Sequence, residues 1–329
     1  MARRTMRAVQ YSGYGGGPAA LKHVEIPVPS PKKDEVLLKV EAAAINPIDC
    51  KIQSGFLRPI LPPKFPFVPV TDIAGEIIEV GHGIIDGFKP GEKVVSWLTF
   101  GRPGGLAEYA VAPVEVTVHR PHQVSAAEGA ALPIAALSAL QALKHITTKF
   151  DGTGEPANVL VTAASGGVGT YTLQLAKLAN LHVTATCGAR NMDLVKSLGA
   201  DEVLDYRTPE GKSMKSSSGR KYDLVVHCTT GVAWSSFEPI LAAHGKVIDL
   251  TPSAGTFILF AFQKLTFSKK KLVPLMVAGN REELQFLVEL VEEGKLRTVM
   301  DSRHELSKAE EAWAKSMEGH ATGKIIVEM

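Results

Sequence analysis

The chain has 329 residues, of which 45% are hydrophobic and 21% are charged. That length favours two domains, each large enough to bury its own core, and the composition excludes disordered, collagen-like and disulfide-stapled proteins. The 36 Lys and Arg residues nearly balance the 34 Asp and Glu residues, so we expect no nucleic-acid partner. Cys50, Cys187 and Cys228 lie far apart in the sequence, so a four-thiolate zinc lobe is excluded and a reducing compartment is expected.

The sequence contains no segment that predicts a membrane span. The longest mostly apolar stretch, Gly129 to Leu143, is shorter than the about 18 residues that a span needs, and Pro133 interrupts it. The N-terminus, MARRTMRAVQY, lacks the apolar region of a secretory signal and is not a long Ser- and Arg-rich transit peptide. We therefore expect a soluble protein, with peripheral membrane contact left open.

Strand-like runs and turns alternate in the first hundred residues. The expected strands are Arg7–Gln10, Glu35–Val40, Ile73–Val80, Lys93–Trp97 and Ala107–Ala112. Six prolines between positions 47 and 69 predict an irregular, functional segment over Asn46–Val70. Ser125 and Glu128 have the spacing of a capping box, which predicts a helix over Ala126–Leu143 with a kink at Pro133.

The middle of the chain alternates short apolar strands with helices, which is typical of a parallel sheet covered on both faces. The expected strands are Val159–Thr162, His182–Thr186, Glu202–Asp205, Leu224–His227 and Lys246–Leu250, and the expected helices are Val168–Ala179 and Met192–Leu198. The tail returns to mixed elements, with helices over Arg281–Glu293 and Ser307–Met317, a strand near Thr298–Met300 and a final strand over Lys324–Glu328.

A glycine-rich turn predicts a dinucleotide site. Residues 159–169 read VLVTAASGGVG, which is a strand, a turn of the form AxGxxG with Ala164 in the first glycine position, and the start of a helix. Glycines here let the backbone approach a pyrophosphate, and Gly169 lets the helix pack on the strand. The alternative is a turn that binds nothing. The cofactor contacts expected from this turn are Ser165, Gly166, Gly167 and Val168.

The residues after the second strand favour NADPH over NADH. An NAD site places Asp or Glu about 20 residues beyond the glycines, but here Cys187, Gly188 and Arg190 follow the strand, with no acid before Asp193. The Arg190 guanidinium suits a 2′-phosphate, and Tyr206 is placed to cover the same end of the cofactor. The alternatives are a solvated charge for Arg190 and a half-buried surface aromatic for Tyr206.

Several motifs together resemble a known family. They are Asn46-Pro47-Ile48-Asp49, Thr71-Asp72-Ile73-Ala74-Gly75, Gly105-Leu106-Ala107-Glu108-Tyr109, Leu137-Ser138-Ala139, the turn just described and Gly323-Lys324-Ile325-Ile326-Val327. Over essentially its whole length the chain resembles the zinc-free medium-chain dehydrogenases/reductases of the quinone oxidoreductase type, most of all the plant chloroplast-envelope members. The resemblance implies an α/β fold, with a GroES-like β-rich catalytic domain over 1–125 and 281–329 and a Rossmann, doubly wound NADPH-binding domain over 126–280.

The resemblance also implies that no zinc is bound. Zinc-dependent relatives carry Cys where this chain has Asn46 and His where it has Thr71, and a catalytic zinc needs about three N, S or carboxylate ligands. Hydride delivery to an already electrophilic carbon is then the expected chemistry. We expect reduction of α,β-unsaturated carbonyls such as long-chain oxidised lipids; the alternatives are a quinone reductase and a low-turnover NADPH-binding protein at a membrane or on RNA.

Lys51 is the predicted catalytic residue. It follows the Asn-Pro-Ile-Asp motif and matches a lysine of the plant enone reductases, and an ammonium stabilises an enolate; the alternative is a loop charge that holds cofactor phosphate or ribose. Asn46 is expected to hydrogen-bond the nicotinamide ribose or the substrate oxygen. Asp49 and Asp72 are expected to bind loop amides and are assigned no chemistry.

Three further residues are predicted beside the nicotinamide. Ser138 lies where the family often has Thr, and Cys228 and Leu250 end successive parallel strands, the edge at which α/β sheets bind ligands. The alternatives are a Ser138 hydroxyl that bonds back to its own helix and core packing for Cys228 and Leu250. The apolar run over Thr256–Phe267 predicts either an entrance for an oily substrate or a homodimer interface. The basic Ser268–Lys271 next to it is either solvated or meets anionic lipid. By resemblance the protein lies at the chloroplast inner envelope as a peripheral protein, with the cytoplasm as the alternative.

Overall fold

The computed structural model describes residues 4–58, 62–83 and 87–329, which form two compact units. One unit runs to Ala135 and resumes at Gly279, and the other spans Ala136–Ala278. The first boundary lies beyond the expected position at residue 125, because α2 (Ala126–Ala131) packs on strands of the first unit. Pro133 then starts a separate helix, α3 (Pro133–Leu143), within which the boundary falls.

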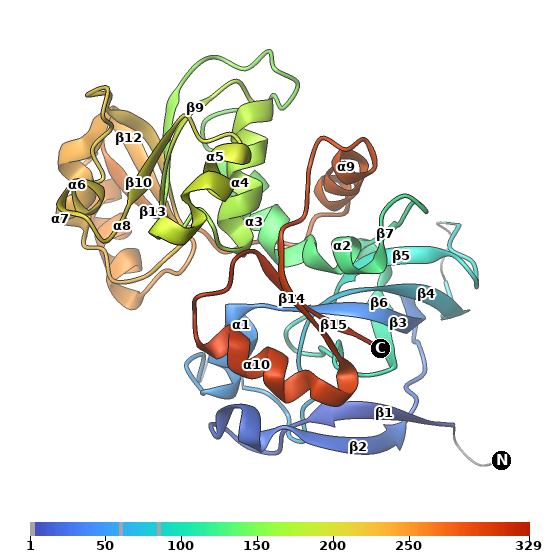
Figure 1. Ribbon diagram of the computed structural model, residues 1–329. Coiled ribbons are helices and arrows are strands. Elements are labelled where there is room, and N and C mark those ends of the chain that lie inside the picture. The colour runs from blue at the N-terminus through green and yellow to red at the C-terminus, as the bar shows by residue number, and fades with distance from the viewer. Residues whose placement is uncertain (1–3, 59–61, 84–86) are drawn as a thin grey trace. The chain divides into compact units, whose positions relative to one another are not determined.

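The first unit is built on β-sheet. A seven-stranded sheet has the order β14-β15-β3-β4-β5-β7, with β6 also paired to β3, and β1 and β2 form a separate pair (Figure 1). The strands are β1 (Thr5–Gln10), β2 (Lys22–Pro27), β3 (Glu35–Ile45), β4 (Asp72–Val80), β5 (Lys93–Trp97), β6 (Tyr109–Pro113), β7 (Thr117–His119), β14 (Met300–Glu305) and β15 (Lys324–Glu328). Because β15 pairs with β3, the C-terminal return segment completes this sheet.

One helix of the first unit differs from expectation. Residues 46–70 were expected to be irregular, but α1 (Pro47–Gln53) occupies the start of that segment. Asn46 and Asp49 form a capping box, and Pro47 lies in the first turn of the helix, where its missing N–H costs nothing. The other helices here are α9 (Arg281–Glu292) and α10 (Ala309–Met317), whose fully buried Trp313 donates its indole N–H to Gln53 at 2.9 Å.

The second unit is the expected doubly wound parallel sheet. Its six strands have the order β10-β9-β8-β11-β12-β13, and every pair is parallel. They are β8 (Asn158–Val161), β9 (His182–Cys187), β10 (Glu202–Asp205), β11 (Tyr222–His227), β12 (Leu241–Asp249) and β13 (Lys271–Pro274). The helices are α4 (Gly167–Leu178), α5 (Met192–Ser197), α6 (Pro209–Ser213), α7 (Trp234–Phe237) and α8 (Ala254–Leu265). The strand order reverses between β8 and β11, and ligands bind at such a point, outside the carboxyl ends of the strands.

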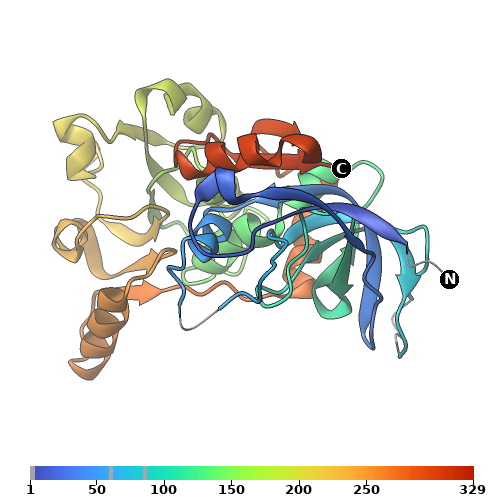
Figure 2. The same ribbon diagram turned by 90° about the horizontal axis from the view of Figure 1, so that it is seen from below.

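The apolar run near residue 260 is a helix. A capping box of Ser253 and Thr256 starts α8, and β13 begins at Lys271, the last residue of the basic run. Figure 2 shows α8, in brown, standing away from the rest of its unit. Its exposed apolar side chains include Ile258, Phe262 and Leu265, which are 71%, 61% and 78% exposed. Among the described residues, none of the helices is both long and apolar enough to cross a membrane.

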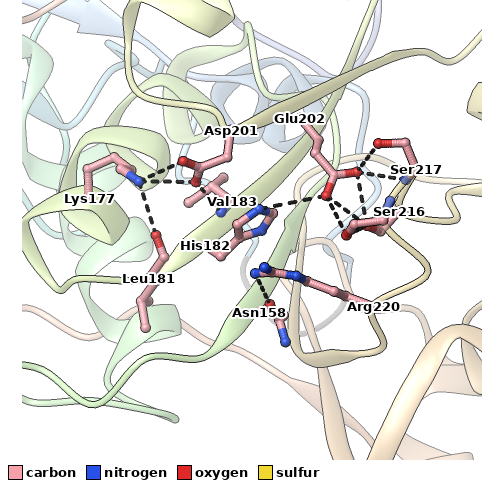
Figure 3. A network of polar contacts seen from close by, with 11 residues as sticks. Asn158, Lys177, Leu181, His182, Val183, Asp201, Glu202, Ser216, Ser217 and Arg220 are labelled. Carbon is pink, nitrogen blue, oxygen red and sulfur yellow. Dashed lines mark hydrogen bonds and ion pairs between the residues drawn. The ribbon is translucent and has the colours of Figure 1, made fainter.

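A polar cluster lies at the amino ends of β8, β9 and β10 in the parallel sheet (Figure 3). The Glu202 carboxylate, at the start of β10, accepts hydrogen bonds from the Ser216 hydroxyl at 2.7 Å and from the Ser217 N–H and hydroxyl at 2.7 and 2.8 Å. Burial opposes ionisation of Glu202, but these bonds prevail and lower its pKa to about 2. The loop before β11 is therefore held to β10 by one carboxylate.

We predict that this carboxylate makes the second unit sensitive to acid. The pKa of Glu202 falls from 4.5 in the unfolded chain to about 2 in the fold, so its contribution to stability is complete above pH 4.5 and is lost as the pH falls towards 2. The free energy of unfolding should fall more steeply over that range in the wild type than in Glu202→Gln, as measured by urea titrations. Glu210→Gln, at an exposed position of α6, is the control and should follow the wild type; equal slopes for all three proteins would contradict the prediction.

Candidate functional site

A buried polar cluster lies where the first unit carries the predicted catalytic residues. Lys324 Nζ donates to Asn46 Oδ1 at 2.5 Å, and Asn46 Nδ2 donates to Asp72 Oδ2 at 2.9 Å. Lys324 Nζ also lies 3.8 Å from Asp72 Oδ2. The Asn46 N–H donates to Asp49 Oδ2 at 2.8 Å. None of the four residues is more than 3% exposed.

The cluster buries two carboxyl groups against one ammonium group. Burial raises the pKa of Asp49 to about 7, although the hydrogen bond from Asn46 opposes the shift. Burial also raises the pKa of Asp72, which Lys324 and the bond from Asn46 counteract, and burial lowers the pKa of Lys324. Both carboxylates accept a hydrogen bond from a backbone amide. Asp49 accepts from the Asn46 N–H, and Asp72 Oδ2 accepts from the Ile134 N–H at 3.1 Å.

Lys51 lies in the last turn of α1, beyond this cluster. Its ammonium is 5.9 Å from the centre of the Phe56 ring, and its carbonyl accepts from the Ser54 hydroxyl at 2.8 Å and from the Phe56 N–H at 3.1 Å. The side chain is half-buried. Lys51 thus presents a positive charge from a short helix whose two ends are held by Asn46 and by the Gln53–Trp313 hydrogen bond.

The glycine-rich turn has the geometry of a pyrophosphate site. It leads from β8 into α4, and Gly166 is the N-terminal capping residue of that helix. A Cβ at Gly169 would lie 2.6 Å from the Ala163 oxygen and the Ala164 Cα, so only glycine lets α4 pack this closely. At Gly166 a Cβ would meet only the Ala163 oxygen, at 3.3 Å. The predicted contacts Ser165, Gly166, Gly167 and Val168 all lie in this turn or in the first turn of α4, whose free N–H groups suit an anion.

Gly188, Arg190 and Tyr206 come together at one end of the same sheet edge. Gly188 and Arg190 follow β9, and Tyr206 follows the neighbouring β10, whose Asp205 pairs with Cys187. The Tyr206 ring lies against Gly188, since a Cβ there would be 3.5 Å from Tyr206 Cε1. Tyr206 is 43% exposed and Arg190 is exposed. That Tyr206 and Arg190 meet the adenosine end of a cofactor stays a prediction.

Cys228 and Leu250, the predicted nicotinamide contacts, directly follow β11 and β12. The Cys228 N–H donates to Thr162 Oγ1 at 3.0 Å, and the Leu250 N–H donates to the His227 carbonyl at 3.1 Å. Burial raises the pKa of the Cys228 thiol to about 12, so the thiol is protonated at neutral pH. Ser138, the remaining predicted contact, lies on α3 and is 6% exposed.

Sequence reasoning gave no part in these clusters to five residues: Thr162, His227, Asp249, Thr256 and Lys324. Thr162 Oγ1 lies 2.9 Å from His227 Nδ1, which joins the ends of β8 and β11, and Asp249 accepts from Thr256 Oγ1 at 2.9 Å. Lys324 was read only as part of a terminal motif. A lysine directly after glycine in an otherwise apolar strand, GKIIV, was the available signal for a buried charge.

The two units define a class of protein before any comparison is made. A doubly wound sheet with a glycine-rich turn after its first strand binds a dinucleotide. Together with a β-rich unit that carries the half-buried Lys51, this architecture indicates an oxidoreductase with a dinucleotide cofactor.

Comparison with known proteins gives the family. A model of the alcohol dehydrogenase GroES-like domain matches residues 32–122, and a model described as zinc-binding dehydrogenase matches residues 198–327. A chloroplast envelope quinone oxidoreductase homolog of Arabidopsis thaliana is 61% identical over the whole of both chains. The chain belongs to the medium-chain dehydrogenase/reductase family and, within it, to the quinone oxidoreductase type, which confirms the resemblance.

Two further proteins extend this result. An Arabidopsis NADPH-dependent alkenal/one oxidoreductase is 32% identical, over 98% of this chain and 80% of that protein. The solved structure of a quinone oxidoreductase from Coxiella burnetii is 30% identical, covers 99% of this chain and 100% of its own, and has a TM-score of 0.87. The GroES-like and Rossmann fold class is thereby confirmed, and the protein is an oxidoreductase that uses a nicotinamide cofactor.

The residues at the family's zinc position do not fit the metal. Asn46 uses both groups of its amide inside the protein, and the Lys324 ammonium that donates to it would repel a cation. Thr71 Oγ1 is turned to Asp72 Oδ1, 3.3 Å away. Among residues 4–58, 62–83 and 87–329, no group of three or more His, Cys, Asp or Glu side chains could hold a metal ion.

Two glycine substitutions should separate folding from cofactor binding. Gly169→Ala places a methyl group 2.6 Å from backbone atoms, so we expect a lower melting temperature without ligand. Gly166→Ala has only a 3.3 Å contact inside the protein. We expect it to keep the melting temperature but to raise the Kd for NADPH about tenfold, because its methyl group would hold the pyrophosphate away from the backbone. Differential scanning fluorimetry and NADPH fluorescence titration check both, and unchanged affinity in Gly166→Ala would place the pyrophosphate elsewhere.

Proposed function

We propose that the protein uses NADPH to reduce apolar α,β-unsaturated ketones and aldehydes, long-chain oxidised lipids among them. The observation that carries the proposal is the Lys324–Asn46 hydrogen bond of 2.5 Å at the family's zinc position. With an ammonium group and an amide there, a metal-held alkoxide is not available, so the substrate must be electrophilic already. A conjugated carbonyl has that property at its β-carbon.

In this proposal Lys51 stabilises the charge that hydride transfer creates. NADPH, when bound, supplies the hydride, and its arrival at the β-carbon turns the carbonyl into an enolate. The half-buried Lys51 ammonium stabilises the enolate oxygen, and a proton from water adds to the α-carbon to complete the saturated product. Asn46 serves this step through its hold on α1, since its amide groups are already bonded within the protein.

Quinones are the second candidate substrates. The Arabidopsis relative with 61% identity and the Coxiella structure both carry quinone oxidoreductase in their names. A quinone is also electrophilic without a metal, and its reduction yields an anion that Lys51 can stabilise in the same way. The name of the alkenal/one relative supports the enone as the first candidate.

We also propose a place in the cell and an assembly. The name of the chloroplast envelope relative supports the chloroplast, with a peripheral position at the inner envelope as the finer proposal. The exposed apolar face of α8 supports either a homodimer or contact with a membrane, and no nucleic-acid partner is proposed.

Replacing Lys51 tests the reaction. Lys51→Met should lower kcat for an enone about 100-fold, which is the usual contribution of a charged acid–base group, with little change in the Kd for NADPH. Lys64→Met, in the same proline-rich segment and exposed, is the matched control and should keep wild-type kcat. Steady-state assays of NADPH oxidation with enones and with quinones measure both. A wild type active only on quinones supports the second candidate, and full kcat in Lys51→Met contradicts the role of Lys51.

Replacing Arg190 tests the choice of cofactor. If its guanidinium binds the 2′-phosphate, Arg190→Ala should raise the Kd for NADPH about tenfold or more and leave the Kd for NADH unchanged. Arg220→Ala is the control, because Arg220 lies 3.4 Å from Asn158 at the amino-end edge of the sheet. Equal losses for both cofactors in fluorescence titrations would show that Arg190 does not read the phosphate.

A further inference from the structure

We propose that Lys324, in the last strand, is a positioning residue that fixes the N-terminal end of α1 and thereby the catalytic Lys51. The proposal rests on the function proposed above, because it matters to catalysis only if Lys51 acts on the substrate. It adds a role for a residue 278 positions from Asn46 in the sequence, in the segment that returns to the first unit.

The fold places the Lys324 side chain in the interior by a tight backbone contact. Gly323 has a φ of 87°, and a Cβ there would lie 2.1 Å from the Val299 oxygen, so glycine is required. The Lys324 N–H donates to that same oxygen at 2.9 Å. Because β15 pairs with β3 through Ile325 and Ile45, Lys324 starts its strand beside Asn46, which directly follows β3.

The ammonium group sets the orientation of the Asn46 amide. The oxygen of the amide faces Lys324 Nζ and its nitrogen faces Asp72 Oδ2. The reversed amide would turn an N–H towards the ammonium and an oxygen towards the carboxylate, and both contacts would be repulsive. Lys324 and Asp72 together therefore hold Asn46 in one state, with Asn46 Nδ2 also donating to the Ala44 carbonyl at 3.2 Å.

The side-chain bonds of Asn46 hold this residue, and its backbone marks where α1 begins. Asn46 is the capping residue of α1, and its N–H donates to Asp49 Oδ2 at 2.8 Å. A helix of seven residues is too short to be stable alone, so its position depends on its anchors. Lys51 lies two residues after Asp49, in the same short helix, so its position depends on the hydrogen bond between Asn46 and Asp49.

The same carboxylate anchors a second helix. Asp72 Oδ2 accepts from the Ile134 N–H, in the first turn of α3, the helix that carries Ser138. One ammonium group thus compensates the carboxylate on which the starts of α1 and α3 both depend. Lys93, by contrast, pairs with Glu41 and Glu76 at 2.5 and 2.7 Å near the surface of the same sheet, with its side chain 40% exposed.

The test compares three variants. Lys324→Met removes the ammonium at nearly constant length but leaves a buried carboxylate without a partner, so it can fail to fold. Lys324→Met/Asp72→Asn removes both charges and keeps the fold testable. Lys93→Met is the control for loss of a lysine ion pair elsewhere in the sheet. Circular dichroism checks folding, and hydrogen exchange read by mass spectrometry reports on residues 47–54, where the Ser54 N–H donates to the Cys50 carbonyl.

We expect the folded double variant to exchange the amides of 47–54 at least tenfold faster and to lose at least tenfold in kcat, with the Kd for NADPH within twofold. Lys93→Met should match the wild type in all three. Unchanged exchange overturns the proposal, and so does faster exchange with full kcat. A wild type inactive on all enones and quinones would contradict the proposed function instead, and hydrogen exchange would still test the anchoring without any substrate.

Discussion

The interaction between Lys324 and Asp72 is the constraint on which the β-rich unit depends. Lys324 Nζ lies 3.8 Å from Asp72 Oδ2, and the Asn46 amide packs against both groups. All three side chains are almost fully buried. Such a pair adds little net stability over an apolar core, but loss of either partner is costly because the other charge stays buried. The pair links β15 to β4 and, through Asn46, to the start of α1.

The same charges explain why the reaction is assigned without a metal. The chain matches a model described as zinc-binding dehydrogenase. At the position of a zinc ligand, however, it has Asn46, which accepts a hydrogen bond from the Lys324 ammonium. A buried lysine cannot bind a substrate oxygen directly, as a metal ion with an open position does. In our proposal Lys324 therefore positions its neighbours, and Lys51 contacts the substrate. Burial raises the pKa of Asp49 to about 7, which places a second, titrating charge next to the start of α1.

Regular elements could be predicted because their signals are local. The cofactor turn, the parallel strands around it and the capping box at Ser125 were read from periodicity and from a few residue types, and the structure contains them. Two local readings were incomplete. The prolines after Asn46 led to the prediction of an irregular segment instead of α1, although proline is favoured in the first turn of a helix. The apolar run at α8 was described without being assigned as a helix.

The candidate site could be predicted only in part, because its decisive contact is not local. The sequence singled out Asn46 and Lys51 but predicted that Asn46 bonds the nicotinamide ribose or the substrate oxygen. The contact with Lys324 could not be predicted, because the pairing of β15 with β3 that makes it depends on the whole sheet. At the cofactor edge, by contrast, Gly188 and Tyr206 were predicted together because neighbouring parallel strands end side by side.

Hydride transfer from NADPH to the β-carbon of a conjugated carbonyl is the reaction that we propose. Its most direct measurement is a turnover with NADPH that carries deuterium at both C4 positions of the nicotinamide, followed by NMR of the product from a simple enone. We expect a saturated ketone with deuterium at the β-carbon. Deuterium at the carbonyl carbon of an allylic alcohol, or no deuterium in any product, would contradict it.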